Sequence, residues 1–137
     1  MPTKDALAVA KRFATALDRC DLAEAGLCLA SDCHYEIGTQ QLIGPDAILA
    51  SYCENAEWAG RALEQVIYES AVEEGQEGLS VLYTDRIVHR GLTHQYSSRQ
   101  HLTINDDGQI TRIVHEELPG QREKLDEFLS QCGVRRW

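Results

Sequence analysis

The sequence predicts a single α+β domain in which a strongly curved antiparallel sheet wraps around helices. Three observations lead to this prediction. Apolar residues recur at helical spacing near both ends of the chain, whereas the pattern after Gly60 changes to the period of two that strands show. Dipeptides typical of tight turns separate the long strands. Strands that follow one another through tight turns pair antiparallel, which favours α+β over alternating βαβ units.

The first half of the chain is predicted to be mainly helical. A first helix runs from Thr3, its expected N-cap, to about Cys20, and a second runs from its cap Asp21 to about Ala30. A strand is expected over Cys33–Ile37. The apolar positions at helical spacing in the first helix are Ala6, Ala10, Phe13 and Leu17.

A third helix is predicted to begin at Gly44-Pro45-Asp46, since proline fits the first turn and an acid suits the helix N-terminus. It should extend to about Trp58. A final amphipathic helix follows Pro119-Gly120 and should stop at Gly133. Between these helices the expected strands are Leu63–Val72, Leu79–His89, Leu92–Ile104 and Gln109–Leu118.

Two turns fix the predicted strand register. Asp107-Gly108 is a preferred two-residue hairpin loop, and Arg90-Gly91 is a second candidate. A longer loop over Glu73–Gly78 joins the first pair of strands. A bulge near Asn105 would shift the register by one residue. The predicted facing pairs are Gln100 with His115, Ser98 with Glu117, Asp106 with Gln109, Asp85 with Tyr96, Tyr83 with Ser98, and Tyr68 with Tyr83.

These registers collect aromatic and apolar side chains with polar tips on one face, the composition of a small-molecule pocket. The opposite face should meet solvent or a partner subunit. The pocket face holds Val66, Tyr68, Val81, Tyr83, Asp85, Tyr96, Ser98, Gln100, Leu102, Ile113, His115 and Glu117. The opposite face holds Thr84, Arg86, Ser97, Arg99, His101, Thr103, Arg112 and Glu116.

Composition limits the partners and the compartment. The 137 residues suit one domain spanning 1–137, and the net charge of −9 argues against nucleic acid or an anionic membrane, which attract basic proteins. No apolar run reaches the length of a membrane span or of a signal sequence. Five irregularly spaced cysteines indicate reduced thiols, so a soluble cytoplasmic protein is expected.

The order of these motifs resembles the nuclear-transport-factor-2-like superfamily, and within it the SnoaL-like and ketosteroid-isomerase-like branch. The resemblance implies a cone-shaped sheet whose mouth is closed by N-terminal helices, a short C-terminal helix and, often, a homodimer formed through the sheet. It rests on Phe13…Leu17-Asp18…Asp21-Leu22, the strand start at Asp32, Ile43-Gly44-Pro45-Asp46-Ala47-Ile48 and Asp107-Gly108-Gln109-Ile110.

The resemblance also argues against steroid isomerisation. In this chain Phe13, Ile37 and Gln100 stand where ketosteroid isomerases have their tyrosine, their general-base aspartate and their oxyanion-binding aspartic acid. Phenylalanine and isoleucine can neither donate nor accept a proton. SnoaL-like cyclases have an acidic residue on the last strand, where this chain has His115, which could still act as an acid or base.

His115 is therefore the first catalytic candidate, because an ordinary imidazole titrates near neutral pH. Asp85 and Glu117 are the candidate partner acids. Each has a structural alternative: His115 as a buried histidine satisfied by Gln100, Glu117 as a solvated acid, and Asp85 as an acid held by tyrosine hydroxyls.

The expected ligand-binding residues are Gln100, Tyr83, Tyr96, Tyr68, Tyr35, Ser98, Phe13 and Trp58. Simple packing is the alternative for the aromatic members of this set. No metal site is expected, since Cys33 and His34 are adjacent in a strand and point to opposite faces. No cofactor is expected either, because the chain has no glycine-rich phosphate loop.

Together these features predict a small-molecule pocket protein. The leading hypothesis is a cofactor-independent acid/base isomerase, cyclase or lyase. A non-catalytic ligand-binding module and a dimerisation domain with a vestigial pocket are the alternatives. An enclosed cavity of a few hundred cubic ångströms would favour a ligand site over the dimerisation domain.

Overall fold

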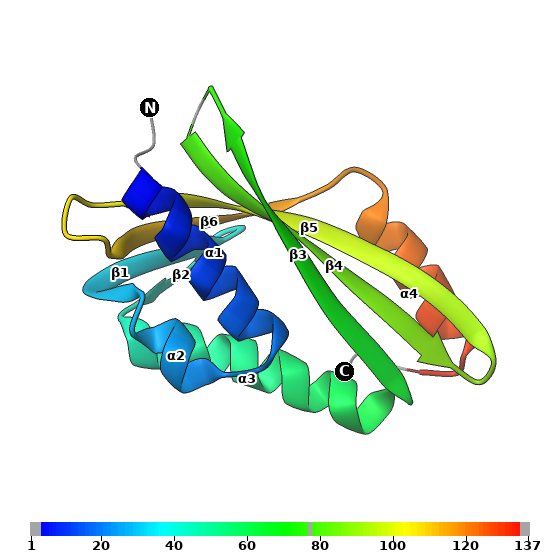
Figure 1. The fold of residues 1–137 in the computed structure, drawn as a ribbon. Helices are drawn as coiled ribbons and strands as arrows, with labels where there is room; N and C mark the ends of the chain where they lie inside the picture. Colours follow the sequence, from blue (N-terminus) through cyan, green and yellow to red (C-terminus); the bar gives the residue numbers. More distant parts are fainter. Residues whose placement is uncertain (1–3, 77, 135–137) are drawn as a thin grey trace.

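The computed structural model describes residues 4–76 and 78–134, with four helices and six strands in this part of the chain (Figure 1). The elements in order are α1 (Lys4–Asp18), α2 (Leu22–Gly26), β1 (Leu29–Ile37), β2 (Gln40–Ile43), α3 (Pro45–Ala62), β3 (Gln65–Gly75), β4 (Gly78–His89), β5 (Leu92–Ile104), β6 (Ile110–Glu117) and α4 (Gln121–Gln131). The α+β class is confirmed.

The six strands form one curved sheet in the order β2-β1-β6-β5-β4-β3, and its two edges do not pair with each other. All neighbouring strands are antiparallel except β1 and β6, which are parallel. The sheet is therefore mixed, where a wholly antiparallel one was predicted. Turn signals specify only strands that follow one another, whereas α3 and four other strands lie between β1 and β6 in the chain.

Helices α1, α2 and α3 lie together on one side of the sheet, and α4 covers the far ends of the long strands (Figure 1). The main core forms where the apolar stripe of α1 meets the sheet, with Ala10, Phe13, Val81 and Ile113 all fully buried. A second cluster joins the end of α3 to α4 through Leu63, Ile87, Leu125, Phe128, Leu129 and Cys132. The two clusters hold the sheet from both ends and leave a space between them.

Several predicted boundaries needed correction. The Asp21 side chain caps α2 by accepting a hydrogen bond from the Glu24 N–H at 3.1 Å, as expected, but α2 ends at Gly26. The following strand starts earlier, at Leu29, because that side chain is buried in the core. The short strand β2, which has largely exposed side chains, carried no strand signal. The predicted cap Thr3 lies outside the described residues.

The sheet register is confirmed for β4 with β5 and for most of β5 with β6, including Gln100 opposite His115. The predicted β3–β4 register is wrong by two residues, so Tyr68 faces Asp85. This hairpin closes between Gly75 and Gly78, a shorter connection than the predicted loop. A shift of two residues leaves every side chain on its predicted face.

The β5–β6 turn also differs in detail from the predicted two-residue loop. The Asn105 N–H donates to the Gln109 carbonyl at 2.9 Å, so the loop contains three residues, and Gly108 adopts a φ of 76°. The Asn105 side chain accepts from the N–H groups of Asp107 and Gln109, which fixes the loop. The register shift this causes lies next to Ile104, close to the expected bulge.

Candidate functional site

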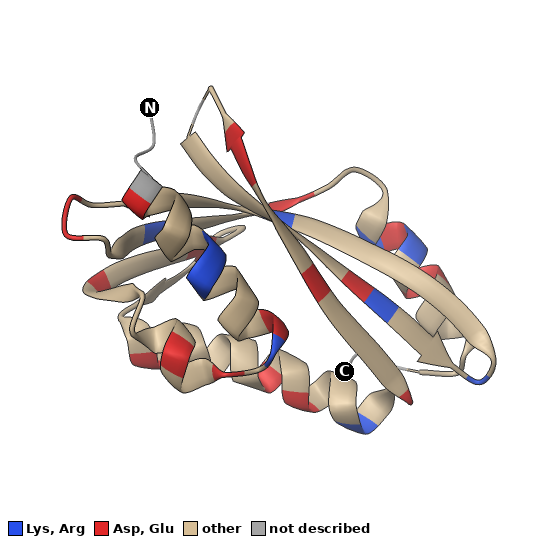
Figure 2. Cartoon of the chain, viewed as in Figure 1, with Lys and Arg blue, Asp and Glu red and all other residues tan. Residues whose placement is uncertain are grey.

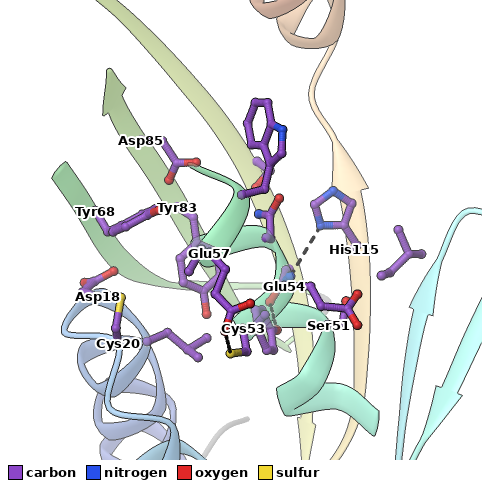
Figure 3. A pocket seen from close by; sticks show the side chains of 18 of the residues that line it. Asp18, Cys20, Ser51, Cys53, Glu54, Glu57, Tyr68, Tyr83, Asp85 and His115 are labelled. Atoms are coloured by element: carbon purple, nitrogen blue, oxygen red, sulfur yellow. Dashed lines mark hydrogen bonds between the residues drawn. The ribbon is translucent and has the colours of Figure 1, made fainter. Parts of the chain in front are cut away.

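One cavity of about 890 Å³ lies between α3, the end of α1 and the inner face of the sheet (Figure 3). Nine of the predicted site residues line it: Tyr35, Trp58, Tyr68, Tyr83, Asp85, Tyr96, Ser98, Gln100 and His115. A cavity of this size holds a multi-ring organic molecule. It therefore meets the size criterion for a ligand site.

The other two predicted residues lie outside the cavity wall. Phe13 is fully buried in the core and packs edge-on against Tyr52, with ring centroids 6.2 Å apart. Glu117 lies at the end of β6 and forms an ion pair with Arg122. That guanidinium lowers the pKa of Glu117, so this carboxyl is held as an anion and is poorly suited to donate a proton.

His115 lies at one end of the cavity, in a hydrogen-bonded group of side chains. Gln100, only 3 % exposed, accepts a hydrogen bond from the Tyr52 hydroxyl at 2.7 Å. Its amide nitrogen donates to the Tyr35 hydroxyl at 2.7 Å and lies 3.5 Å from His115 Nδ1. The position that resembles an oxyanion-binding acid thus holds an amide that organises three neighbouring side chains.

The protonation state of His115 follows from these contacts. Burial lowers the pKa of its imidazole, with opposing influences from Glu117, which raises it, and Arg122, which lowers it further. The nitrogen of the Gln100 amide is a donor only, so its contact with Nδ1 requires that Nδ1 carry no proton. A neutral imidazole then carries its proton on Nε2, which becomes a hydrogen-bond donor.

The opposite end of the cavity is acidic. Asp18, at the end of α1, accepts a hydrogen bond from the Ser70 hydroxyl at 2.5 Å, and Asp85 comes from β4. Burial raises the pKa of both carboxyls, and for Asp85 burial together with the negative charge of Asp18 raises it to about 6. Asp85 is therefore ionised at neutral pH and is a stronger base than an ordinary aspartate.

Tyrosines form the walls between these two ends. Burial raises the pKa of both Tyr35 and Tyr68 to about 12, so their hydroxyls stay protonated. The Tyr83 hydroxyl is inaccessible to solvent and has no hydrogen-bond partner among the described residues. A buried tyrosine hydroxyl normally has a partner, so the lack of one at Tyr83 is unusual.

The cavity also has a cationic rim at Arg122. Its guanidinium lies 5.7 Å from the centre of the Tyr96 ring and 3.5 Å from the Tyr96 hydroxyl. Glu117, on its other side, holds the guanidinium in this place. The acid predicted to be catalytic therefore positions an arginine beside the cavity.

Asp85 and His115 are too far apart to touch. They lie on β4 and β6, with β5 between them, and their partners on β5, Tyr96 and Gln100, are four residues apart. With about 4.8 Å between strands and about 3.4 Å per residue, their Cα atoms lie roughly 17 Å apart on a flattened sheet. Figure 3 shows them on opposite sides of the pocket. A ligand that meets both must span the cavity.

Sequence reasoning missed several residues of the wall. Asp18 and Cys20 come from the end of α1 and the turn after it, and Tyr52 and Cys53 come from α3. Tyr52 recurs at helical spacing with the apolar residues Ile48 and Leu49, and this was the available signal. Asp18 carried none, because an acid at a helix end is usually solvated. Only the hydrogen bond to Ser70, 52 positions along the chain, brings it into the site.

No protein-family model matches the chain, and no curated protein matches it in sequence. Solved structures do match. They include a provisionally named polyketide cyclase from Xanthomonas campestris pv. campestris, at 18% identity and a TM-score of 0.64, covering 94% of this chain and 97% of that one. A provisionally named SnoaL-like polyketide cyclase from Shewanella denitrificans OS-217 has 12% identity and a TM-score of 0.67, with coverages of 92% and 99%.

A third match is TerC, co-crystallised with polyporic acid, at 14% identity and a TM-score of 0.65, covering 90% of this chain and 99% of that one. These similarities confirm that the chain has the nuclear-transport-factor-2-like, SnoaL-like fold. At such identities they establish the fold and leave the activity to be argued from the site. In the described part of the chain no helix is long and apolar enough to cross a bilayer.

Proposed function

We propose that the protein is a small-molecule acid/base enzyme of the isomerase, cyclase or lyase type that acts on a partly apolar substrate without a cofactor. The observation that carries this proposal is the placement of Asp85 and His115 at opposite ends of one tyrosine-walled cavity. The names of similar structures agree with it, since they include provisionally named polyketide cyclases and a protein co-crystallised with polyporic acid.

The two ends of the cavity suit two roles in one reaction: a base that removes a proton and a donor that stabilises the oxygen on which charge develops. The Asp85 carboxylate takes a proton from a substrate carbon, and the C–H electron pair moves through a conjugated system to a carbonyl oxygen. His115 donates a hydrogen bond from Nε2 to that oxygen as negative charge develops on it. In an isomerisation the protonated Asp85 then returns the proton to another carbon. In a cyclisation the enolate carbon attacks a second carbonyl, and the protonated Asp85 gives its proton to the alkoxide that forms.

Deuterium exchange tests this proposal before the natural substrate is known. Cyclic ketones, 1,3-diketones and enones of one to three rings are incubated with the protein in D2O, and deuterium incorporation at carbon is followed by mass spectrometry. We expect at least one compound to exchange faster with the protein than with buffer, and to lose that acceleration with Asp85→Asn. Compounds that bind in the cavity by NMR and yet show no accelerated exchange would contradict the acid/base proposal and favour a binding module.

We also propose that the protein forms a homodimer through the convex face of the sheet. This face carries both positive and negative side chains, which form the ion pairs Arg99–Glu73 and Arg112–Glu36. Two-fold assembly is also the commonest form of association. Light scattering should give about twice the 15.3 kDa mass of one chain. A single-chain mass at tens of micromolar protein would contradict this assembly.

A further inference from the structure

The acidic end of the cavity has more acceptors than the protein uses. None of the ion pairs formed within residues 4–76 and 78–134 involves Asp18 or Asp85. The nearby cation Arg86 lies on the opposite face of β4, where it pairs with Glu69. Both carboxyls are partly buried, and neither has a cationic partner there, although withdrawing an unpaired charge from water is costly.

The strand register brings these acceptors close together. Ser70 faces Tyr83 and Tyr68 faces Asp85 in the β3–β4 pair, and all four lie on the inner face. The Ser70 hydroxyl holds the Asp18 carboxylate at 2.5 Å, directly beside the Tyr83 position. Residues two apart on a strand are separated by about 7 Å, and facing residues by about 5 Å. The register therefore places Asp85, Tyr83 and the Ser70-held Asp18 at the same end of the cavity.

The Tyr83 hydroxyl is the independent sign that a ligand belongs here. It is inaccessible to solvent and has no partner among the described residues, although its side chain lines the cavity next to the two acids. Its oxygen can accept a hydrogen bond. Together with the two carboxylates it provides three acceptors, which matches the three N–H donors of a primary ammonium group.

The acidic residues that helix α3 adds to the wall also favour a cation. Helix α3 adds two more acids to the lining, Glu54 and Glu57. The one basic residue that α3 contributes to the lining is Arg61. Figure 2 shows the acidic positions on α2, on α3 and at the end of α1. Tyrosine rings add a further attraction for cations. An anionic substrate would meet repulsion at this end.

We propose that the substrate carries a protonated amine, and that Asp18, Asp85 and Tyr83 bind this ammonium group at the α1 end of the cavity. This inference rests on the proposed function, because it names the class of substrate for the same site. Asp18 anchors the ammonium through the Ser70-held carboxylate. Asp85, beside it, removes the proton from a neighbouring carbon. An ammonium here would also supply the positive charge that both partly buried carboxyls lack.

Three ligands of the same shape test the proposal: 1-(aminomethyl)naphthalene, 1-(hydroxymethyl)naphthalene and 1-naphthoic acid, which are a cation, a neutral molecule and an anion at neutral pH. Binding is measured by isothermal titration calorimetry and located by NMR shifts of the cavity residues. We expect the amine to bind most tightly and the acid most weakly. Asp18→Asn should weaken the amine by about 10–100-fold, the worth of a buried charge-assisted hydrogen bond, and should leave the alcohol nearly unchanged.

Proton release on binding is a second measurement that tests the ammonium site. A bound ammonium lowers the pKa of Asp85, so amine binding near pH 6 should release protons, seen as a dependence of the binding enthalpy on the buffer. Asp107→Asn, an exposed aspartate in the β5–β6 turn, is the matched control and should change neither reading. Equal binding of amine and alcohol in the cavity would overturn the ammonium site and leave the acid/base proposal standing. If none of the three binds in the cavity, the proposed function fails as well.

Discussion

Asp85→Asn should lower turnover by roughly 10²–10⁴-fold, the usual worth of a positioned general base. Asparagine keeps the size and polarity of the side chain but cannot accept a proton. The measurement is the rate of deuterium exchange or product formation with the best compound from the exchange screen. Asp107→Asn is the matched control, because the same chemical change on an exposed turn should leave the rate as it was.

The same substitution should make the folded protein more stable at high pH. The pKa of Asp85 is raised from 3.8 to about 6 in the folded protein, mainly by burial and further by the charge of Asp18. A carboxyl with a raised pKa contributes stability below its unfolded pKa and loses it as pH rises through the folded pKa. At about pH 8 the ionised carboxyl therefore costs about 3 kcal/mol, a cost that asparagine avoids.

Urea unfolding at about pH 8 and about pH 5 measures this difference. We expect Asp85→Asn to raise the free energy of unfolding at the higher pH and to lose about half of that advantage at the lower pH. Loss of activity combined with a gain in stability is a result that a packing defect cannot produce. A variant that is both inactive and less stable at about pH 8 would contradict the assignment of Asp85 as a buried base.

His115→Phe should lower turnover by roughly 10²–10³-fold, the usual cost of removing one donor to a developing oxyanion. Phenylalanine is close in size to histidine, so the fold should survive with a modest loss from the Gln100 contact. His115→Gln restores an N–H donor and should recover part of the lost rate. A packing role alone would not distinguish the two variants in this order.

The exposed His34 provides the control for His115. His34→Gln changes the same residue type on β1, away from the cavity, and should leave the rate unchanged. The contradictory result would be equal rates for His115→Phe and the unsubstituted protein. That result would assign the oxygen-polarising role to another donor of the wall, with the Tyr83 hydroxyl as the next to replace.

Much of the fold could be predicted because its signals are local. The Arg90-Gly91 turn fixes β4 against β5, and Asp107-Gly108 fixes most of β5 against β6, so Gln100 and His115 were placed opposite each other correctly. The parallel pairing of β1 with β6 has no such signal, since the two strands are far apart in the sequence. The β3–β4 register was wrong because Glu73–Gly78 contains more than one plausible turn.

The residues of the candidate site also differ in whether local signals could predict them. Alternation along the strands identified the residues that the sheet contributes, including Asp85 and His115. The helices contribute Asp18 and Tyr52, whose roles depend on tertiary contacts with Ser70 and Gln100 that no spacing rule predicts. Glu117 shares the inner face with His115, and only the neighbouring Arg122 shows that its carboxylate is already paired.

The most direct test of the account is the titration of the aspartate side chains by ¹³C NMR in the ligand-free protein, with Asp85→Asn identifying the Asp85 signal. We expect Asp85 to titrate near pH 6, well above an ordinary aspartate, because of its burial and the neighbouring charge of Asp18. Such a carboxyl would be the base that neutral-pH proton transfer requires. An Asp85 signal that titrates in the ordinary range for aspartate would contradict the account.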